Sequence, residues 1–158
     1  MNKFYLGAVL AIGLASSANA AVTDRMMVPI HQFMDGFERG DMKLAGSAHD
    51  ASGVTIVDEV PPHLWTGRTA FAAWGADLAK DDKAAGISGE RVVLGAPTRQ
   101  EVTGDHGYVV APAVFTYMQK GVAMREPAHM TFAMRRGPAG WKIAAWTWVG
   151  GKAAPAGK

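Results

Sequence analysis

The sequence predicts an α+β fold, in which a curved antiparallel sheet wraps around about three N-terminal helices. Two observations carry this prediction. Apolar residues recur at helical spacing in the first half of the chain, and from about Gly86 onward they alternate with a period of two. Helices followed by a run of antiparallel strands is the order of an α+β domain. Because bulged strands curl a sheet, we expect the helices to close its concave side.

The first twenty residues have the composition of a secretory signal peptide. Lys3 gives a positive start, Phe4 to Ala15 is an unbroken apolar and glycine run, and Ala18-Asn19-Ala20 is a small-x-small cleavage site. We therefore predict cleavage after Ala20 and a periplasmic or secreted protein. The apolar run is too short to span a bilayer comfortably, so no membrane attachment is expected after cleavage.

The remaining composition narrows the function. Residues 21–150 have the size of one domain, and residues 151–158 contain only Gly, Lys, Ala and Pro, which predicts a disordered tail. The chain has no cysteine and therefore no disulfide. The net charge is only +2, and no basic run exceeds Arg135-Arg136, which argues against nucleic-acid binding. No His-x-x-His and no acidic cluster with ligand spacing occur, so neither a metal site nor a cofactor is expected.

The first two helices are predicted on either side of a Gly-Asp pair. Pro29 suits the first turn of a helix and Gly40 suits its end. Asp41 can then cap a short second helix that runs to about His49. We expect His49 to be solvated there, with its imidazole favoured by the helix dipole. The inward residues are Ile30, Phe33, Met34 and Phe37 of the first helix and Met42, Ala45 and Ala48 of the second.

A strand, a loop and a third helix follow. Val54 to Glu59 alternates and is rich in β-branched residues, which predicts a strand. Two prolines in residues 60–65 predict a loop. The third helix begins at Thr66 or Gly67 and ends in the polar stretch 81–83. Its apolar stripe is Phe71, Trp74 and Leu78.

The second half of the chain is predicted to consist of strands joined by tight turns. The turns are Gly104-Asp105, residues 119–121 and the hairpin loop 137–140. Pro112 and Pro127 fall inside strands, where proline indicates a bulge or an unpaired edge. The predicted strands are residues 89–95, 99–103, 107–119, 122–136 and 141–149.

Three short signals have a family-like order and spacing. They are Gly40-Asp41 after the first helix, Asp58 nine residues before Gly67, and Gly140 to Ile143 at the start of the last strand. Together they resemble the nuclear transport factor 2-like superfamily, which includes ketosteroid isomerase, scytalone dehydratase and the SnoaL-like polyketide cyclases. The resemblance covers roughly residues 25–149. It implies a cone-shaped α+β barrel, often dimeric, with a pocket between helices and sheet.

Asp58 is the candidate catalytic residue. Val54, Ile56 and Asp58 share one strand face, so the carboxylate should face inward, be partly desolvated and act as a base. The resemblance places the general base of ketosteroid isomerase at this position. The alternative is that Asp58 caps a turn or pairs with an arginine. Glu59 is expected to point away, so that it cannot pair with Asp58 in catalysis.

Two positions depart from the isomerase pattern. Phe33 stands where the resemblance requires a hydroxyl donor to an oxyanion, and it has no donor. The second donor position corresponds to His129, or to Met130 if the register slips by one. A neutral His129 would donate one hydrogen bond, which is half an oxyanion hole. The alternation leaves open which of the two faces the pocket, since Met130 belongs to the more apolar face.

Further candidates for the pocket wall are aromatic or imidazole side chains. Tyr117 offers a phenol, or is a core residue with its hydroxyl at the rim. Trp74 lies on the apolar stripe of the third helix. His63 and Trp65 follow the two prolines over the expected mouth, where they form either a lid or a packing anchor.

The last predicted strand favours a homodimer. Trp141 and Ile143 share one face, and Trp146 and Trp148 share the other. If the first pair packs on the helices, two indoles remain outside, and such an apolar patch favours an interface between two copies. The alternative is a bulge that reverses the phase and turns both Trp side chains into the pocket.

Two functions remain in balance. The first is an exported protein of the SnoaL-like type that binds a small apolar molecule and turns it over without a cofactor. Its acid–base chemistry would resemble that of an isomerase, cyclase or dehydratase and would centre on Asp58. The second is a non-catalytic ligand-binding or dimeric interaction module on the same fold. An enclosed cavity that holds Asp58 and a second polar group would favour the first, and a wholly apolar cavity the second.

Overall fold

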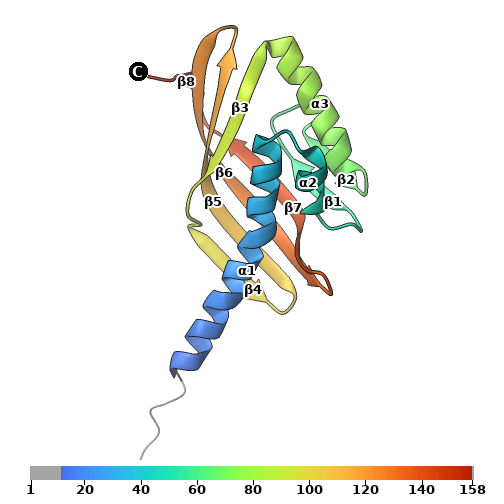
Figure 1. Cartoon of the computed structure of the whole chain (residues 1–158), viewed down its shortest axis with the longest axis vertical. Helices are drawn as coiled ribbons and strands as arrows, with labels where there is room; N and C mark the ends of the chain where they lie inside the picture. The colour runs from blue at the N-terminus through green and yellow to red at the C-terminus, as the bar shows by residue number, and fades with distance from the viewer. Residues whose placement is uncertain (1–11, 158) are drawn as a thin grey trace, which may run out of the picture.

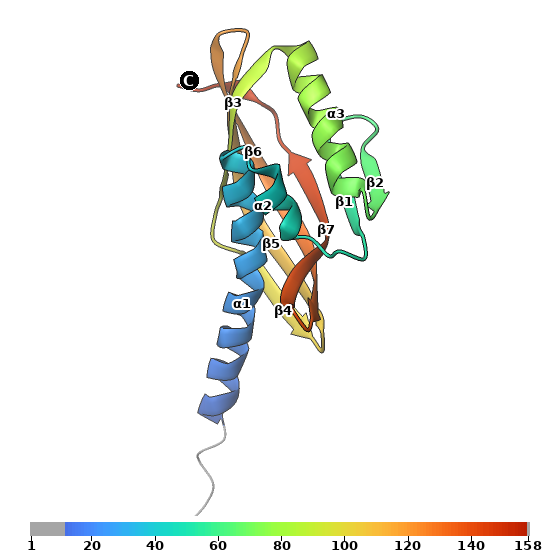
Figure 2. The same cartoon turned by 45° about the vertical axis from the view of Figure 1, so that its right-hand side comes forward.

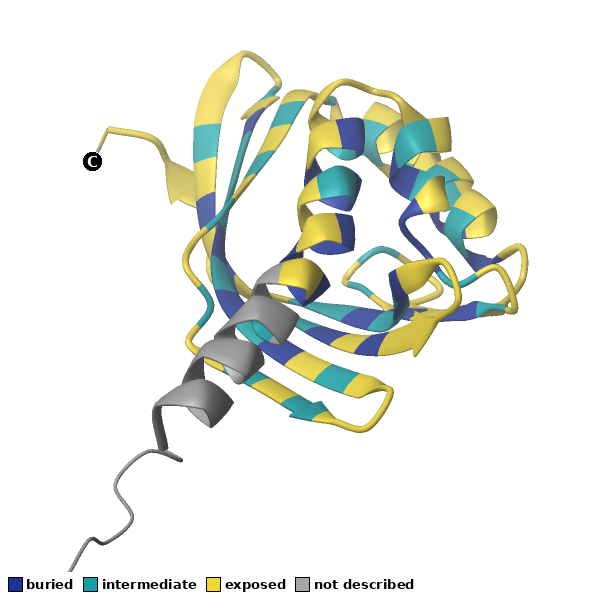
Figure 3. Ribbon diagram, turned by 60° about the horizontal axis from the view of Figure 1, so that its bottom comes forward, coloured by how far each residue is buried: buried dark blue, intermediate teal, exposed yellow. Residues whose placement is uncertain are grey.

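Three helices lie inside the curl of an eight-stranded sheet in the computed structural model, which describes residues 12–157 (Figures 1 and 3). Side chains are described from Thr23 onward, apart from Asp24. The α+β class and the curved sheet around the helices are confirmed. Among the described residues the helices are α1 (Ile12–Glu38), α2 (Met42–Ser47) and α3 (Ala70–Ala85).

The sheet is mixed rather than wholly antiparallel, because β1 and β7 run parallel. The hydrogen-bonded order is β2-β1-β7-β6-β5-β3, with β4 paired to β5 and β8 paired to β6. Figure 2 shows β1 and β2 at one edge, beside α3. The strands are β1 (Val54–Val57), β2 (Leu64–Gly67), β3 (Ile87–Leu94), β4 (Arg99–Thr103), β5 (His106–Gln119), β6 (Val122–Gly137), β7 (Gly140–Gly150) and β8 (Ala154–Pro155).

Helix α1 extends further toward the N-terminus than its apolar face predicted. It includes Pro29 and begins at Ile12, so it spans the predicted cleavage point at Ala20. Residues 1–11 of the predicted signal peptide lie outside the described residues, and the peptide stays a prediction. In the described part of the chain, no helix is long and apolar enough to cross a membrane. The inner face of α1 buries Ile30 and Phe33, as expected.

Helix α2 begins as the sequence predicts, at an aspartate cap. The Asp41 carboxylate accepts a hydrogen bond from the Leu44 amide at 2.9 Å, which satisfies one of the free N–H groups at the helix start. Ala45 is fully buried, because Gly36 of α1 lets the two backbones approach closely. The inward prediction for Met42 is wrong: it lies in the first turn of α2 with its methyl group beside Gly75 of α3, and it is 38% exposed.

The segment after the two prolines differs from the predicted loop and helix start. Leu64–Gly67 forms β2 and pairs antiparallel with β1, Val57 opposite Leu64. The prolines restrict only their own neighbourhood, and the residues after them satisfy their backbone groups on the free edge of β1. Helix α3 therefore begins at Ala70, after both residues predicted to open it.

Both strand prolines lie where a strand changes its neighbour. On β5, pairing to β4 reaches Val110 and pairing to β3 starts at Ala113, so Pro112 lies in the gap. On β6, Pro127 lies between Ala128, which pairs with β7, and Arg125, which pairs with β8. A missing N–H costs least at such positions. The β8 pairing also corrects the prediction of a wholly disordered tail.

A bulge in β7 reverses the direction of its side chains. Ala133 of β6 pairs with Ala145 and the next residue, Met134, pairs with Ile143, so Ala144 is an extra residue. Ile143 is buried before the bulge, and Trp146 is 2% exposed after it. The prediction that Trp146 and Trp148 lie on the outer face is therefore wrong, and the bulge alternative is confirmed. The homodimer loses this support and stays a prediction.

Candidate functional site

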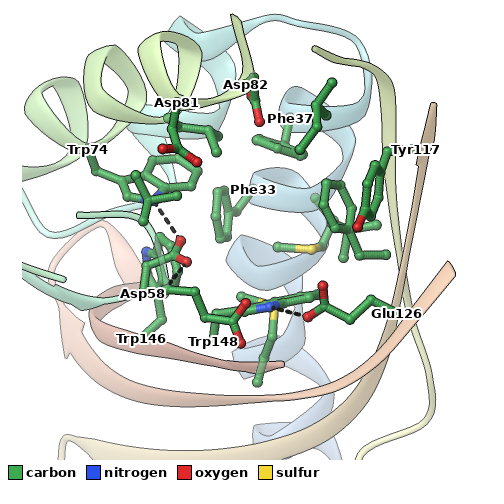
Figure 4. Close-up of a pocket in the computed structure, with 18 residues that line it drawn as sticks. Phe33, Phe37, Asp58, Trp74, Asp81, Asp82, Tyr117, Glu126, Trp146 and Trp148 are labelled. Atoms are coloured by element: carbon green, nitrogen blue, oxygen red, sulfur yellow. Dashed lines mark hydrogen bonds between the residues drawn. The ribbon is translucent and has the colours of Figure 1, made fainter. Parts of the chain in front are cut away.

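A cavity of about 340 Å³ lies between the helices and the inner face of the sheet (Figure 4). This volume is at the small end of ligand pockets, which span roughly 300–1,000 Å³. Its wall comes from α1, the turn after β1, α3 and four strands. The lining residues are Phe33, Met34, Phe37, Asp58, Glu59, Val60, Trp74, Leu78, Asp81, Asp82, Ile87, Val92, Phe115, Tyr117, Glu126, Met130, Trp146 and Trp148.

Asp58 lies on this wall, half-buried, with both carboxylate oxygens oriented by hydrogen bonds. The Trp74 indole Nε1–H donates to Oδ2 at 2.7 Å, and the Glu59 amide donates to Oδ1 at 2.6 Å. Burial raises the pKa of Asp58, and these hydrogen bonds oppose the rise. Among the described residues no arginine or lysine forms an ion pair with it. The environment is that of a desolvated, oriented carboxylate.

Glu59 also lines the cavity, which corrects the prediction that it points away. Strand β1 ends at Val57, and the Asp58 amide donates to the His63 carbonyl across a turn at 3.2 Å. The alternation of a strand no longer applies in that turn, so consecutive side chains can face the same space. Asp58, Glu59 and Val60 all contribute to the wall.

Glu126 is the second polar group of the cavity, and the sequence analysis missed it. It is 7% exposed, on the inner face of β6, and accepts a hydrogen bond from Trp148 Nε1 at 3.2 Å. Burial raises its pKa, and the charges of Glu59 and Asp58 raise it further. A Cβ on Gly150 would meet carboxylate oxygens of both Glu126 and Glu59, so these two acids converge on the end of β7. The signal was present, since Glu126 shares its phase with Met130.

Two further acids line the cavity near the end of α3. Asp81 and Asp82 both line it. Burial first, and then the neighbouring Glu90, raise the pKa of Asp82 to about 7. An acid in the last turn of a helix also faces the negative end of the helix dipole. Asp82 therefore holds its proton more readily than an ordinary aspartate.

The structure divides the predicted wall residues into two groups. Phe33, Trp74, Tyr117 and Met130 line the cavity together with Asp58. His129 does not: it alternates with Met130 on β6 and is exposed on the outer face. His63 is exposed at the turn, and Trp65 is buried away from the cavity, where its indole donates to Asp77 at 2.8 Å. The pocket predictions for His129, His63 and Trp65 are corrected accordingly.

Next to the cavity lies a cluster of rings that we call the His49 cluster: His49, Phe33, Phe71, Trp74 and Trp146. His49 is 6% exposed, which corrects the expectation that it is solvated. Its Nδ1 lies 3.0 Å from the Ala45 carbonyl, and Trp146 Nε1–H donates to its Nε2 at 3.1 Å. These partners require a neutral ring with the proton on Nδ1. Burial lowers the pKa of His49 to about 4. The ring thus fixes the Trp146 indole that forms part of the cavity wall.

Comparisons by sequence give no relative. No protein-family model matches the chain, and no curated protein matches it.

Comparison with solved structures gives many matches to one fold. A nuclear transport factor 2-like protein from Novosphingobium aromaticivorans is 19% identical, with 90% of each chain covered and a TM-score of 0.66. A ketosteroid isomerase-like protein from Erwinia carotovora atroseptica is 13% identical, with 82% of this chain and 96% of that chain covered and a TM-score of 0.64. A type 2 hexachlorocyclohexane dehydrochlorinase is 15% identical, with 92% and 94% covered and a TM-score of 0.69. The chain therefore has the nuclear transport factor 2-like fold, as the order and spacing of its sequence motifs predicted.

Proposed function

We propose that the protein binds a small, largely apolar molecule in this cavity and moves a proton on it, with Asp58 as the base and without a cofactor. The observation that carries the proposal is the environment of Asp58. Its carboxylate faces a pocket lined by aromatic rings, and burial raises its pKa, which makes the carboxylate a stronger base. The hydrogen bonds from Trp74 and Glu59 fix the direction in which it accepts.

The proposed step is the removal of a C–H proton next to an electron-withdrawing group. A lone pair of Asp58 takes the proton, and the electron pair of the C–H bond moves into the substrate. Isomerisation returns the proton from Asp58 to another carbon. In elimination the C–H electron pair forms a C=C bond, the leaving group departs with the electron pair of its own bond to carbon, and Asp58 releases the proton to water. Two of the structural neighbours have names that describe such reactions, a ketosteroid isomerase-like protein and a dehydrochlorinase. At 13% and 15% sequence identity, their structural similarity supports the shared fold alone. The chemistry belongs to the proposal.

The second candidate is a binding module without turnover, and one observation favours it. Phe33 lines the cavity where the isomerase pattern has a hydroxyl donor, and His129 is turned outward. The charge that develops on a carbonyl oxygen would have to be stabilised by other donors, since such donors contribute a large share of catalysis. A protonated Glu126 or the Tyr117 hydroxyl would have to supply the hydrogen bond.

The experiment begins with a ligand that co-purifies with the protein from its own source, identified by native mass spectrometry. The wild type is then incubated with that compound in D2O, and deuterium incorporation at its acidic carbon is followed by NMR. We expect exchange that falls by about 100-fold or more in Asp58→Asn, in line with the usual contribution of a general base. Binding without exchange in the wild type would favour the binding module.

We also propose export, supported by the composition of residues 1–20. Intact-mass measurement of the protein from its own cells is expected to give a chain that starts at Ala21. A mature chain that retains Phe4 to Ala15 would contradict export by cleavage.

A further inference from the structure

The wall of the cavity is rich in carboxylic acids. Five carboxylic acids line it, Asp58, Glu59, Asp81, Asp82 and Glu126, and among the described lining residues there is no Lys, Arg or His. The four ion pairs of the described chain all involve other acids. Glu126 is buried, Asp58 and Asp82 are half-buried, and Glu59 and Asp81 are exposed. Burying an acid without an ion pair is costly, so the three acids that are at least half-buried need an explanation.

The same wall is rich in aromatic rings. Phe115 stacks on Tyr117 with centroids 4.7 Å apart, and Trp148 meets Phe115 edge-on at 6.1 Å. These rings stand beside Glu126, whose carboxylate Trp148 holds. Ring faces carry negative potential and attract cations, most strongly where water is excluded. Rings and carboxylates therefore favour the same sign of charge at this end of the cavity.

Glu126 and Glu59 converge on the end of β7, and the other acids are spread around the wall. Figure 4 places Asp58 and Glu126 on opposite sides of the space. Among the described residues there is no group of three or more His, Cys, Asp or Glu side chains that would hold a metal ion. A cation that fits must therefore be extended and partly apolar.

We infer that the ligand of this cavity is an organic cation, a protonated or quaternary amine on an apolar body. The inference rests on the proposed function and specifies its substrate class. The ammonium group lies between Glu126 and Glu59, against Trp148 and Tyr117. The apolar body extends past Phe33 toward Trp74, which brings its far carbon to Asp58. The cationic end thus sets the orientation in which Asp58 meets the ligand.

The test uses three probes with the same body and different charge: phenethylammonium, phenethyl alcohol and phenylacetate. Binding is followed by tryptophan fluorescence at low salt, since Trp74, Trp146 and Trp148 line the cavity. We expect the cation to bind about tenfold more tightly than the alcohol, and the anion to bind more weakly than either. Equal affinities for the cation and the alcohol, or a preference for phenylacetate, would overturn the inference.

Matched variants assign the selectivity to the cavity. Glu126→Gln keeps the shape and an acceptor for Trp148 but removes a charge, so it should lower the affinity for phenethylammonium about tenfold and leave that for the alcohol within about twofold. Glu101→Gln removes an equal charge from exposed β4 and should change neither. An equal loss in both variants would mean that net charge, and not the site, attracts the cation, which would contradict the inference.

The outcomes also separate this inference from the proposed function. If the alcohol binds as well as the cation, the cavity is a ligand site without charge selection, and the proposed function stands alone. If none of the three probes binds, both the inference and the small-molecule pocket are contradicted. Selective binding of the cation without any proton exchange in the co-purified compound would leave a cation-binding module.

Discussion

The His49 cluster and the cavity are neighbours that share Phe33, Trp74 and Trp146, yet they treat buried polar groups in opposite ways. In the cluster, His49 has a partner on each ring nitrogen and carries no charge. In the cavity, Glu126 is a buried acid and Asp58 a half-buried one, and their hydrogen-bond donors are neutral indole or amide groups. The polar atoms of the cluster have all their hydrogen-bond partners without a ligand. The acids of the cavity form no ion pair among the described residues, and a cationic ligand can supply one.

This difference indicates where stability and function reside. A sealed, fully bonded group of rings contributes to folding at all times. Acids that face one another across a cavity cost stability in the free protein, which is the usual trade at a functional site. The shared residues connect the cluster to the cavity, because His49 accepts the hydrogen bond that orients Trp146, and Trp146 is part of the cavity wall.

The largest expected effect comes from truncating Trp146, which the two regions share, compared with Trp148, which lines the cavity alone. Trp146→Ala should lower the free energy of unfolding by about 3–5 kcal/mol, since it removes a side chain that is 2% exposed and leaves His49 without its donor. Trp148→Ala should cost roughly half as much, because Trp148 is only partly buried and already faces space. Urea unfolding of both variants measures the difference. Equal losses would contradict the comparison.

A second experiment uses pH to weaken the cluster. The pKa of His49 is about 4 in the folded protein and about 6.5 when unfolded. Between these two pH values, His49 takes up a proton in the unfolded chain but not in the folded protein. The contribution of neutral His49 to stability is therefore complete above pH 6.5 and is lost as the pH drops toward 4. The loss should be on the order of 2–3 kcal/mol. His49→Gln should remove this dependence of stability on pH, and the control variant His106→Gln, at an exposed position, should keep it. Thermal unfolding from pH 4 to 8 shows the profiles.

The smallest effect concerns the cavity. Because the pKa of Asp58 is raised, its penalty is absent at low pH and becomes full as the pH rises through the folded pKa. Asp58→Asn should therefore leave stability at pH 7 unchanged or raise it by up to about 1 kcal/mol. Asp50 is the control, because hydrogen bonds from the amide and the hydroxyl of Ser52 lower its pKa. Asp50→Asn should therefore lower the stability of the protein. A clear drop for Asp58→Asn in thermal unfolding would make Asp58 a structural residue.

Local rules predicted much of this molecule. The Asp41 cap depends on neighbouring residues alone, and the inward position of Asp58 follows from the strand before it. Glu126 was within reach of the same reasoning, because it shares its phase with Met130. Each of these features depends on a period or a short motif, which a sequence displays directly.

The features that escaped prediction depend on distant partners. His49 is buried because Trp146, 97 residues later, lies over it. Glu59 reaches the cavity because β1 ends two residues earlier than its β-branched pattern indicates. Nothing in the residue type of Ala144 marks it as the extra residue of a bulge. Each depends on how strands pair, which the local pattern does not specify.

The bulge at Ala144 has a consequence for the outer surface of the sheet. A shift of one residue in the pairing of a strand exchanges its inside and its outside. If Ala144 were paired as an ordinary strand residue and Ile143 stayed inward, Trp146 and Trp148 would turn to the outer face. The cavity would lose two residues of its wall, and the sheet would gain an exposed apolar patch. In this fold, a ligand pocket and a surface for self-association therefore differ by whether one residue of β7 is bulged or paired.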